Sequence, residues 1–155
     1  MGVISGAHRG VLIVRIAIAA DHAGFDMKKH VKERLQTWGH SVEDYGVHDT
    51  RSADYADFGR PAAQAVAYGK ADRGILIDGA GVAMSIVANR IPFVRAVVCN
   101  EAYMAEMARS HNDANVLCLG GRMIGVQMVD RILETFLNTE FEGGRHERRI
   151  AKIEE

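Results

Sequence analysis

The sequence has almost no excess charge of either sign. Its 155 residues carry 19 basic and 20 acidic side chains, which gives a formal net charge of -1 at pH 7. Because so even a balance produces no global electrostatic field, the composition argues against nucleic acid or an anionic membrane as the partner. We therefore expect the partner to be a small molecule.

Cysteine is also scarce. The two cysteines, Cys99 and Cys118, both lie in apolar stretches, AVVCN and NVLCLGG. This pattern is unlike the disulfide framework of a small secreted protein, which needs many paired cysteines. It predicts buried, reduced thiols in a cytoplasmic protein.

Long hydrophobic runs are missing as well. The first apolar run, residues 11–20, is interrupted by Arg15 and leads directly into charged sequence. It is too short for a membrane span and lacks the cleavage pattern of a secretion signal, so we interpret it as a β-strand. We expect residues 1–12 to form a disordered leader. Residues 13–155, rich enough in apolar side chains to bury a core, should form a single domain with a C-terminal tail.

Strand and helix patterns alternate along this domain. Short apolar runs predict strands at residues 13–20, 41–45, 74–77, 96–99 and 116–119. Apolar residues at helical spacing predict helices at residues 28–38, 61–68, 82–89, 101–110 and 126–137. This alternation predicts an α/β protein in which helices cover both faces of a parallel five-stranded sheet, a three-layer αβα sandwich.

Polar and glycine residues follow the predicted strands, where parallel sheets bind their ligands. These segments are Asp21-His22-Ala23-Gly24, Asp78-Gly79-Ala80-Gly81, Asn100-Glu101 and Gly120-Gly121-Arg122. A glycine turn that enters a helix offers backbone N–H groups to a phosphate or an oxyanion. The turn is neither a dinucleotide fingerprint nor a P-loop, whose lysine is missing. For Gly79 and Gly81 taken alone, a purely geometric role is an equal alternative.

Basic residues gather near the C-terminus in the segment GGRHERR, residues 143–149. Guanidinium groups can hold a phosphate through two parallel hydrogen bonds, which suits Arg145, Arg149 and Arg122. A solvated basic surface is the alternative for this segment in isolation. The accompanying glycine turns and the Asp21-His22 pair favour phosphate binding.

Six segments resemble a known family. They are ADHAGF (20–25), DYADF (54–58), ADRGILI (71–77), MSIVANRIP (84–92), HNDANVLCLGGR (111–122) and LNTEFEGGRHERR (137–149). Together they are similar to ribose-5-phosphate isomerase B and the two galactose-6-phosphate isomerase subunits, over nearly the whole chain beyond residue 14. The resemblance implies a Rossmann-like sheet and a cytoplasmic enzyme of the pentose phosphate pathway. It also implies a homodimer or a tetramer of dimers, no metal or other cofactor, and active sites formed between two subunits.

The resemblance also implies roles for particular residues. In the family, the matching positions contact the sugar or its phosphate, and here they are Asp21, His22, Tyr55, His111, Asn112, Arg122, Arg145 and Arg149. The family's catalytic loop reads CGTG, with its cysteine as the base. Here Asp78 and Ala80 stand in place of the cysteine and the threonine. Asn100 stands where the family has a ring-opening histidine, and Met84 where some members carry a glutamate base.

Asp78 is therefore the expected base of an aldose–ketose isomerase. A partly desolvated carboxylate can remove the hydrogen at C2 of an open-chain sugar phosphate. The amides of Gly79 and Gly81 would stabilise the enediolate, and Asp21 and His111 would open the sugar ring. The first expected reaction converts ribose 5-phosphate to ribulose 5-phosphate.

Other readings stay open. Ala80 and Asn100 replace family residues at two positions expected to line the substrate. These changes leave a tetrose phosphate, another pentose phosphate or a hexose phosphate as the alternative substrate. A second class is a non-catalytic subunit that completes the site of a paralogue, since the galactose-6-phosphate isomerase subunit that lacks the cysteine works only beside its partner. A flavodoxin-like nucleotide binder is a third reading, on fold analogy alone.

Overall fold

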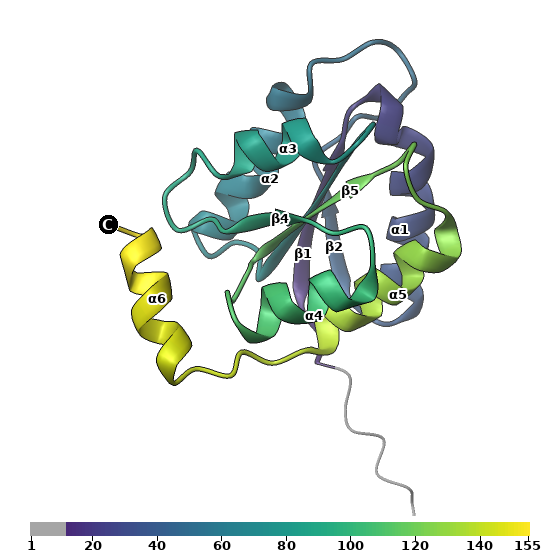
Figure 1. Cartoon of the computed structure of the whole chain (residues 1–155). Helices are drawn as coiled ribbons and strands as arrows, with labels where there is room; N and C mark the ends of the chain where they lie inside the picture. Colours follow the sequence, from purple (N-terminus) through teal and green to yellow (C-terminus); the bar gives the residue numbers. More distant parts are fainter. Residues whose placement is uncertain (1–11) are drawn as a thin grey trace, which may run out of the picture.

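The computed structural model describes residues 12–155 (Figure 1). The leader expected at residues 1–12 lies outside the described residues except for Leu12. Five strands form one sheet: β1 (Arg15–Ala20), β2 (Ser41–Asp44), β3 (Arg73–Asp78), β4 (Ala96–Val98) and β5 (Val116–Gly120). Their order across the sheet is β2-β1-β3-β5-β4, and every neighbouring pair is parallel. The predicted parallel five-stranded sheet is confirmed.

Helices cover both faces of the sheet (Figure 1). They are α1 (Phe25–Thr37), α2 (Tyr55–Ala67), α3 (Val82–Ala88), α4 (Ala102–Ser110), α5 (Val126–Asn138) and α6 (Arg145–Ile153), with the short 3-10 helix η1 (His22–Gly24) before α1. Apolar side chains of α1, α4 and α5 form one core cluster with alternate residues of the strands, and those of α2 and α3 form a second cluster with the others. The three-layer αβα sandwich is therefore confirmed. No helix within residues 12–155 is long and apolar enough to cross a membrane.

The two cysteines are buried and unpaired, as the sequence predicts. Cys99 belongs to the core cluster on the α1, α4 and α5 side of the sheet, and Cys118 belongs to the cluster on the other side. Burial raises the pKa of Cys99 to about 12, and it also raises that of Cys118. Both thiols are therefore protonated and chemically quiet at neutral pH.

The C-terminal segment, expected to be a tail, contains the helix α6. Gly143 and Gly144 precede it with φ angles of 70° and 58°, which only glycine adopts readily, and they turn the chain into the helix. His146 is the buried residue of α6. At the C-terminal end of α6, Glu154 Oε1 lies 2.6 Å from Nη1 of Arg95, the residue that precedes β4. The basic residues of this segment therefore have fixed positions on a helix.

Candidate active site

The carboxylate of Asp78 ends β3 and points at the beginning of α3. Its side chain is only 4% exposed. One carboxylate oxygen, Oδ2, accepts a hydrogen bond of 3.2 Å from the backbone N–H of Met84. The other oxygen, Oδ1, is buried and has no hydrogen-bond partner among the described residues. One oxygen is thus held by the start of α3, and the other is buried without a hydrogen bond from residues 12–155.

The surroundings of Asp78 raise the pKa of its carboxyl group. Burial is the main cause, because it disfavours the charged form, and the negative charge of Asp21 acts in the same direction. The amides of Met84, Gly81 and Ala83 oppose this by stabilising the carboxylate. A carboxylate with a raised pKa is a better proton acceptor. The amides at the start of α3 therefore stabilise the negative charge of Asp78, while burial makes its carboxylate more basic.

The glycine turn joins the ends of β3 and β5. The N–H of Gly121 donates to the carbonyl of Asp78 at 2.8 Å, and the N–H of Arg122 donates to the carbonyl of Gly79 at 3.1 Å. Gly81 has a φ of 81°, and a Cβ there would lie 3.1 Å from the backbone carbon of Leu119. The geometric reading of Gly81 is therefore supported, because no other residue fits this position without strain.

The Asp21-His22 pair follows β1 at the same edge of the sheet. Asp21 Oδ1 accepts hydrogen bonds from the amides of Ala23 and Gly24 at 2.9 and 3.1 Å, so this carboxylate caps η1. His22 Nδ1 accepts from the N–H of Ala53 at 3.1 Å. In the neutral ring, the proton then lies on Nε2, which can donate to a ligand.

The remaining predicted residues of this edge are exposed. Arg122 follows β5 beside the glycine turn, and Asn100 follows β4. Tyr55 begins α2, two residues after the Ala53 amide that holds His22, and its side chain is 44% exposed. The carboxyl edge of the sheet therefore brings together a buried carboxylate, a glycine turn and one guanidinium group, all from residues near strand ends.

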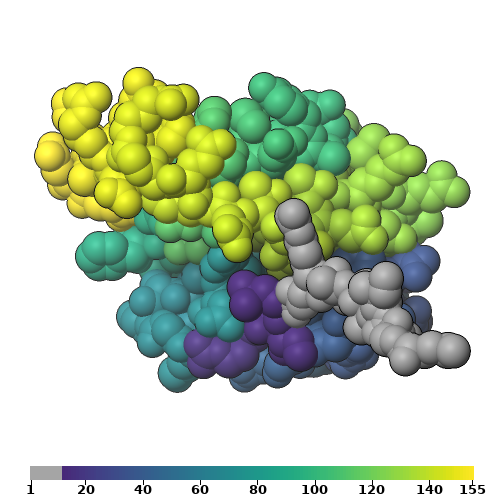
Figure 2. Space-filling view, turned by 90° about the horizontal axis from the view of Figure 1, so that it is seen from below, coloured from purple at the N-terminus to yellow at the C-terminus, as the bar shows by residue number. Residues whose placement is uncertain are grey.

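The other predicted residues lie at the opposite, amino edge of the sheet. His111 ends α4, and the carbonyl of Asn112 accepts a 2.9 Å hydrogen bond from Nε of Arg95, which directly precedes β4. Arg145 and Arg149 belong to α6. Figure 2 views the molecule from below and shows this last segment, in yellow, on the face where the purple start of β1 also lies. Within one chain, His111 and these arginines are thus separated from Asp21 and Asp78.

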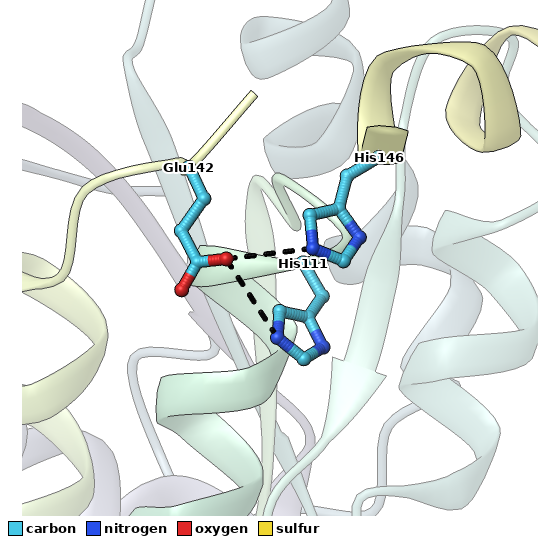
Figure 3. Close-up of side chains that lie close together, drawn as sticks. All are labelled: His111, Glu142 and His146. Atoms are coloured by element: carbon cyan, nitrogen blue, oxygen red, sulfur yellow. Dashed lines mark ion pairs between the residues drawn. The ribbon is translucent and has the colours of Figure 1, made fainter. Parts of the chain in front are cut away.

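A cluster of three side chains at this edge was not foreseen in full. Nε2 of His146 lies 3.4 Å from Oε2 of Glu142, and Nε2 of His111 lies 3.9 Å from the same oxygen (Figure 3). The two imidazole rings stack with their centroids 4.3 Å apart. Glu142 and His146 stand four residues apart in the segment EGGRH, but the sequence pattern led us to select only Arg145 from this segment.

Taken together, the open α/β sheet, the buried carboxylate beside a glycine turn and the nearby Arg122 suit an enzyme that acts on a small anionic substrate. Comparison with known proteins makes this more specific. A family model described as Ribose/Galactose Isomerase matches residues 16–153. The chain belongs to this family and is a sugar phosphate isomerase.

Individual relatives agree with this assignment. The chain is 42% identical to ribose-5-phosphate isomerase B of Escherichia coli over 139 residues, which cover 90% of the chain and 93% of that protein. It is 39% identical to a D-erythrulose-4-phosphate isomerase of Pectobacterium atrosepticum, with 91% and 93% covered. Its structure is similar to that of a ribose 5-phosphate isomerase of Thermotoga maritima, with a TM-score of 0.89, 50% identity and 91% and 97% of the two chains covered.

Proposed function

We propose that this chain catalyses the aldose–ketose isomerisation of ribose 5-phosphate to ribulose 5-phosphate, with Asp78 as the base. The observation that carries the proposal is the buried Asp78 carboxylate at the end of β3, whose oxygen Oδ1 has no hydrogen-bond partner within residues 12–155. Similarity to the Escherichia coli and Thermotoga maritima ribose 5-phosphate isomerases supports ribose 5-phosphate as the substrate. The even charge balance and the absence of a membrane-spanning helix within residues 12–155 are compatible with a cytoplasmic location.

The reaction moves one proton between neighbouring carbons. Asp78 removes the hydrogen from C2 of the open-chain aldose as a proton, and the electron pair of that bond forms a double bond between C1 and C2. The π pair of the C1 carbonyl moves onto its oxygen, which gives the enediolate. Asp78 then returns a proton to C1, and the hydroxyl proton moves from the oxygen of C2 to that of C1. The backbone amide of Gly81 already stabilises the carboxylate of Asp78. We therefore propose that the amides of Gly79 and Ala80 stabilise the enediolate.

Substrate binding uses charges at both edges of the sheet. Arg122 and the Nε2 hydrogen of His22 lie at the carboxyl edge, while His111, Arg145 and Arg149 lie at the amino edge. We propose that a second copy of the chain supplies the amino-edge groups, in a homodimer or a tetramer of dimers. Exposed apolar side chains on α3 and α4, beside the edge strand β4, support such an interface. They are Val82, Ile86, Tyr103 and Met104.

Two alternatives to this function, another substrate and a role as a subunit, have specific support. Similarity to the D-erythrulose-4-phosphate isomerase makes a tetrose phosphate the second candidate substrate. Similarity to a galactose-6-phosphate isomerase subunit of Clostridium acetobutylicum, at 34% identity, keeps the paired-subunit reading as an alternative. In that reading, the chain would complete the site of a paralogue.

Exchange of the C2 hydrogen tests the proposal. The purified chain is incubated with ribose 5-phosphate in deuterated water, and exchange is followed by NMR beside the Asp78→Asn variant. We expect exchange with the wild-type chain and none with the variant. If the wild-type chain shows no exchange, the ribose assignment is wrong. Exchange at C1 of D-erythrulose 4-phosphate and at C2 of aldohexose 6-phosphates then distinguishes another substrate from an inactive single subunit.

A further inference from the structure

The cluster at the amino edge has the composition of a metal site. His111, Glu142 and His146 each offer one potential ligand atom, and these atoms all lie within 4.8 Å of one another (Figure 3). The two imidazole rings are stacked, so the partly exposed ring of His111 would turn to bring its Nε2 to an ion shared with His146. We propose that these three residues bind a divalent transition-metal ion of the Zn²⁺ class. The ion would not be a cofactor of the isomerisation, because it would occupy His111, the residue assigned to ring opening.

The distances suit a tetrahedral ion. Zinc bonds of about 2.0–2.1 Å to nitrogen and oxygen place neighbouring ligand atoms roughly 3.3 Å apart. The separations from Glu142 Oε2 to the two Nε2 atoms are 3.4 and 3.9 Å. The Glu142 side chain is 56% exposed, so it can rotate toward the histidines without disturbing the core.

A second observation at the same place points to a ligand. His146 is only 4% exposed, and its buried Nε2 has no hydrogen-bond partner among the described residues. An unsatisfied buried nitrogen is costly, and a metal ion would satisfy it.

The ligand set selects among metals. Imidazole nitrogen suits Zn²⁺, Co²⁺, Ni²⁺ and Cu²⁺, whereas Mg²⁺ and Ca²⁺ prefer sites made of oxygen alone. Three protein ligands leave the fourth position to water. If the proposed function holds, a bound ion would occupy His111, the residue assigned to ring opening, and would therefore inhibit the isomerase.

Metal binding is tested directly with the full-length, untagged chain. Co²⁺ is titrated while its visible absorption is recorded, because tetrahedral Co²⁺ absorbs strongly, and Zn²⁺ is titrated by calorimetry. We expect one ion per chain. Glu142→Gln, an exposed change that should not disturb folding, and His146→Asn should each weaken binding by at least about tenfold, since even residues outside the ligand shell commonly contribute that much. His48→Gln, at an exposed histidine away from the cluster, is the matched control and should bind as the wild type does.

The outcomes separate this site from the proposed function. Absence of a saturable Co²⁺ or Zn²⁺ signal, or equal binding by wild type and Glu142→Gln, would overturn the metal site. Stoichiometric binding that both variants lose would establish it, whether or not the chain isomerises ribose 5-phosphate. Inhibition of the wild type by Zn²⁺, reversed by a chelator and weakened in Glu142→Gln, would establish the effect on His111. Full activity with the ion bound would refute the proposed inhibition through His111 but not the metal site.

Discussion

Asp78, the proposed base, stands in an environment that is unfavourable for its charge. Its carboxylate is buried, and burial raises its pKa. We expect Asp78→Asn to lower kcat on the order of 10²–10⁴-fold, which is typical of a lost general base. The asparagine oxygen can still accept the hydrogen bond of Met84, but it carries no buried charge, so the variant should unfold at a higher temperature than the wild type at neutral pH. Activity assays and thermal unfolding of both proteins measure this.

The stability difference should depend on pH in a defined direction. A raised pKa means that the folded state holds the Asp78 proton more tightly than the unfolded state does, so the carboxyl group lowers stability as the pH rises through the folded pKa. The advantage of Asp78→Asn should therefore shrink as the pH falls from the folded pKa of Asp78 toward the unfolded pKa of an aspartate, below which both states are protonated. Asp26→Asn, at an exposed carboxylate, is the control. A variant that is less stable than wild type at neutral pH would contradict this account.

At the scale of elements, a buried ion pair joins α1 to β2. Lys28 Nζ lies 2.7 Å from Asp44 Oδ1, and the side chains are only 3% and 14% exposed. Burial alone would raise the pKa of Asp44, but the hydrogen bonds from Lys28, Gly46 and Lys32 leave it below its ordinary value. The pair therefore stabilises the fold above the unfolded pKa of Asp44, and this contribution is lost as the pH falls through the folded pKa.

Removing Lys28 should leave the carboxylate of Asp44 with only the more exposed Lys32 and the amide of Gly46 as partners. We expect Lys28→Met to lower the free energy of unfolding by about 3 kcal/mol at neutral pH, because the largely buried carboxylate loses its buried partner. The loss should become smaller in acid, where Asp44 is protonated. Urea unfolding at several pH values measures both effects. Lys29→Met changes the exposed neighbouring lysine and should have little effect; equal losses in the two variants would argue against a specific role of the pair.

Sequence patterns placed the elements well and their ends less well. The helix expected at residues 61–68 in fact begins at Tyr55 and contains Pro61. Proline is favoured in the first turn of a helix, and this preference misplaced the start. The helix α6 was missed because its buried residue, His146, is polar and gives no apolar period. Local patterns do not reveal which polar side chain the tertiary structure buries.

At the scale of the whole molecule, the proposed site needs two chains. Asp78 and His111 lie at opposite edges of one sheet, so we expect a second copy to supply His111. Asp78→Asn and His111→Asn proteins should each be inactive, and mixing them by co-refolding should restore activity. Random pairing makes half of the dimers mixed, each with one intact site of two, so about a quarter of wild-type activity should return.

A second mixture controls for this recovery. Asp78→Asn mixed with a chain that carries both changes cannot form any site with an intact Asp78, so it should stay inactive. Light scattering on the same samples establishes the number of chains in each particle. If the first mixture stays inactive while mixed dimers are present, the site does not combine these residues from two chains.

The sequence by itself determined the alternation of strands and helices, the parallel sheet and the place of Asp78 at the end of a strand. These features depend on hydrophobic period and turn chemistry, which are local along the chain. Only the packed structure shows that Oδ1 of Asp78 has no hydrogen-bond partner among residues 12–155 and that His111 lies at the amino edge of the sheet. It also shows that Glu142 and His146 cluster with His111. Burial, desolvation and distances between segments far apart in sequence arise only when the layers pack, so no local pattern contains them.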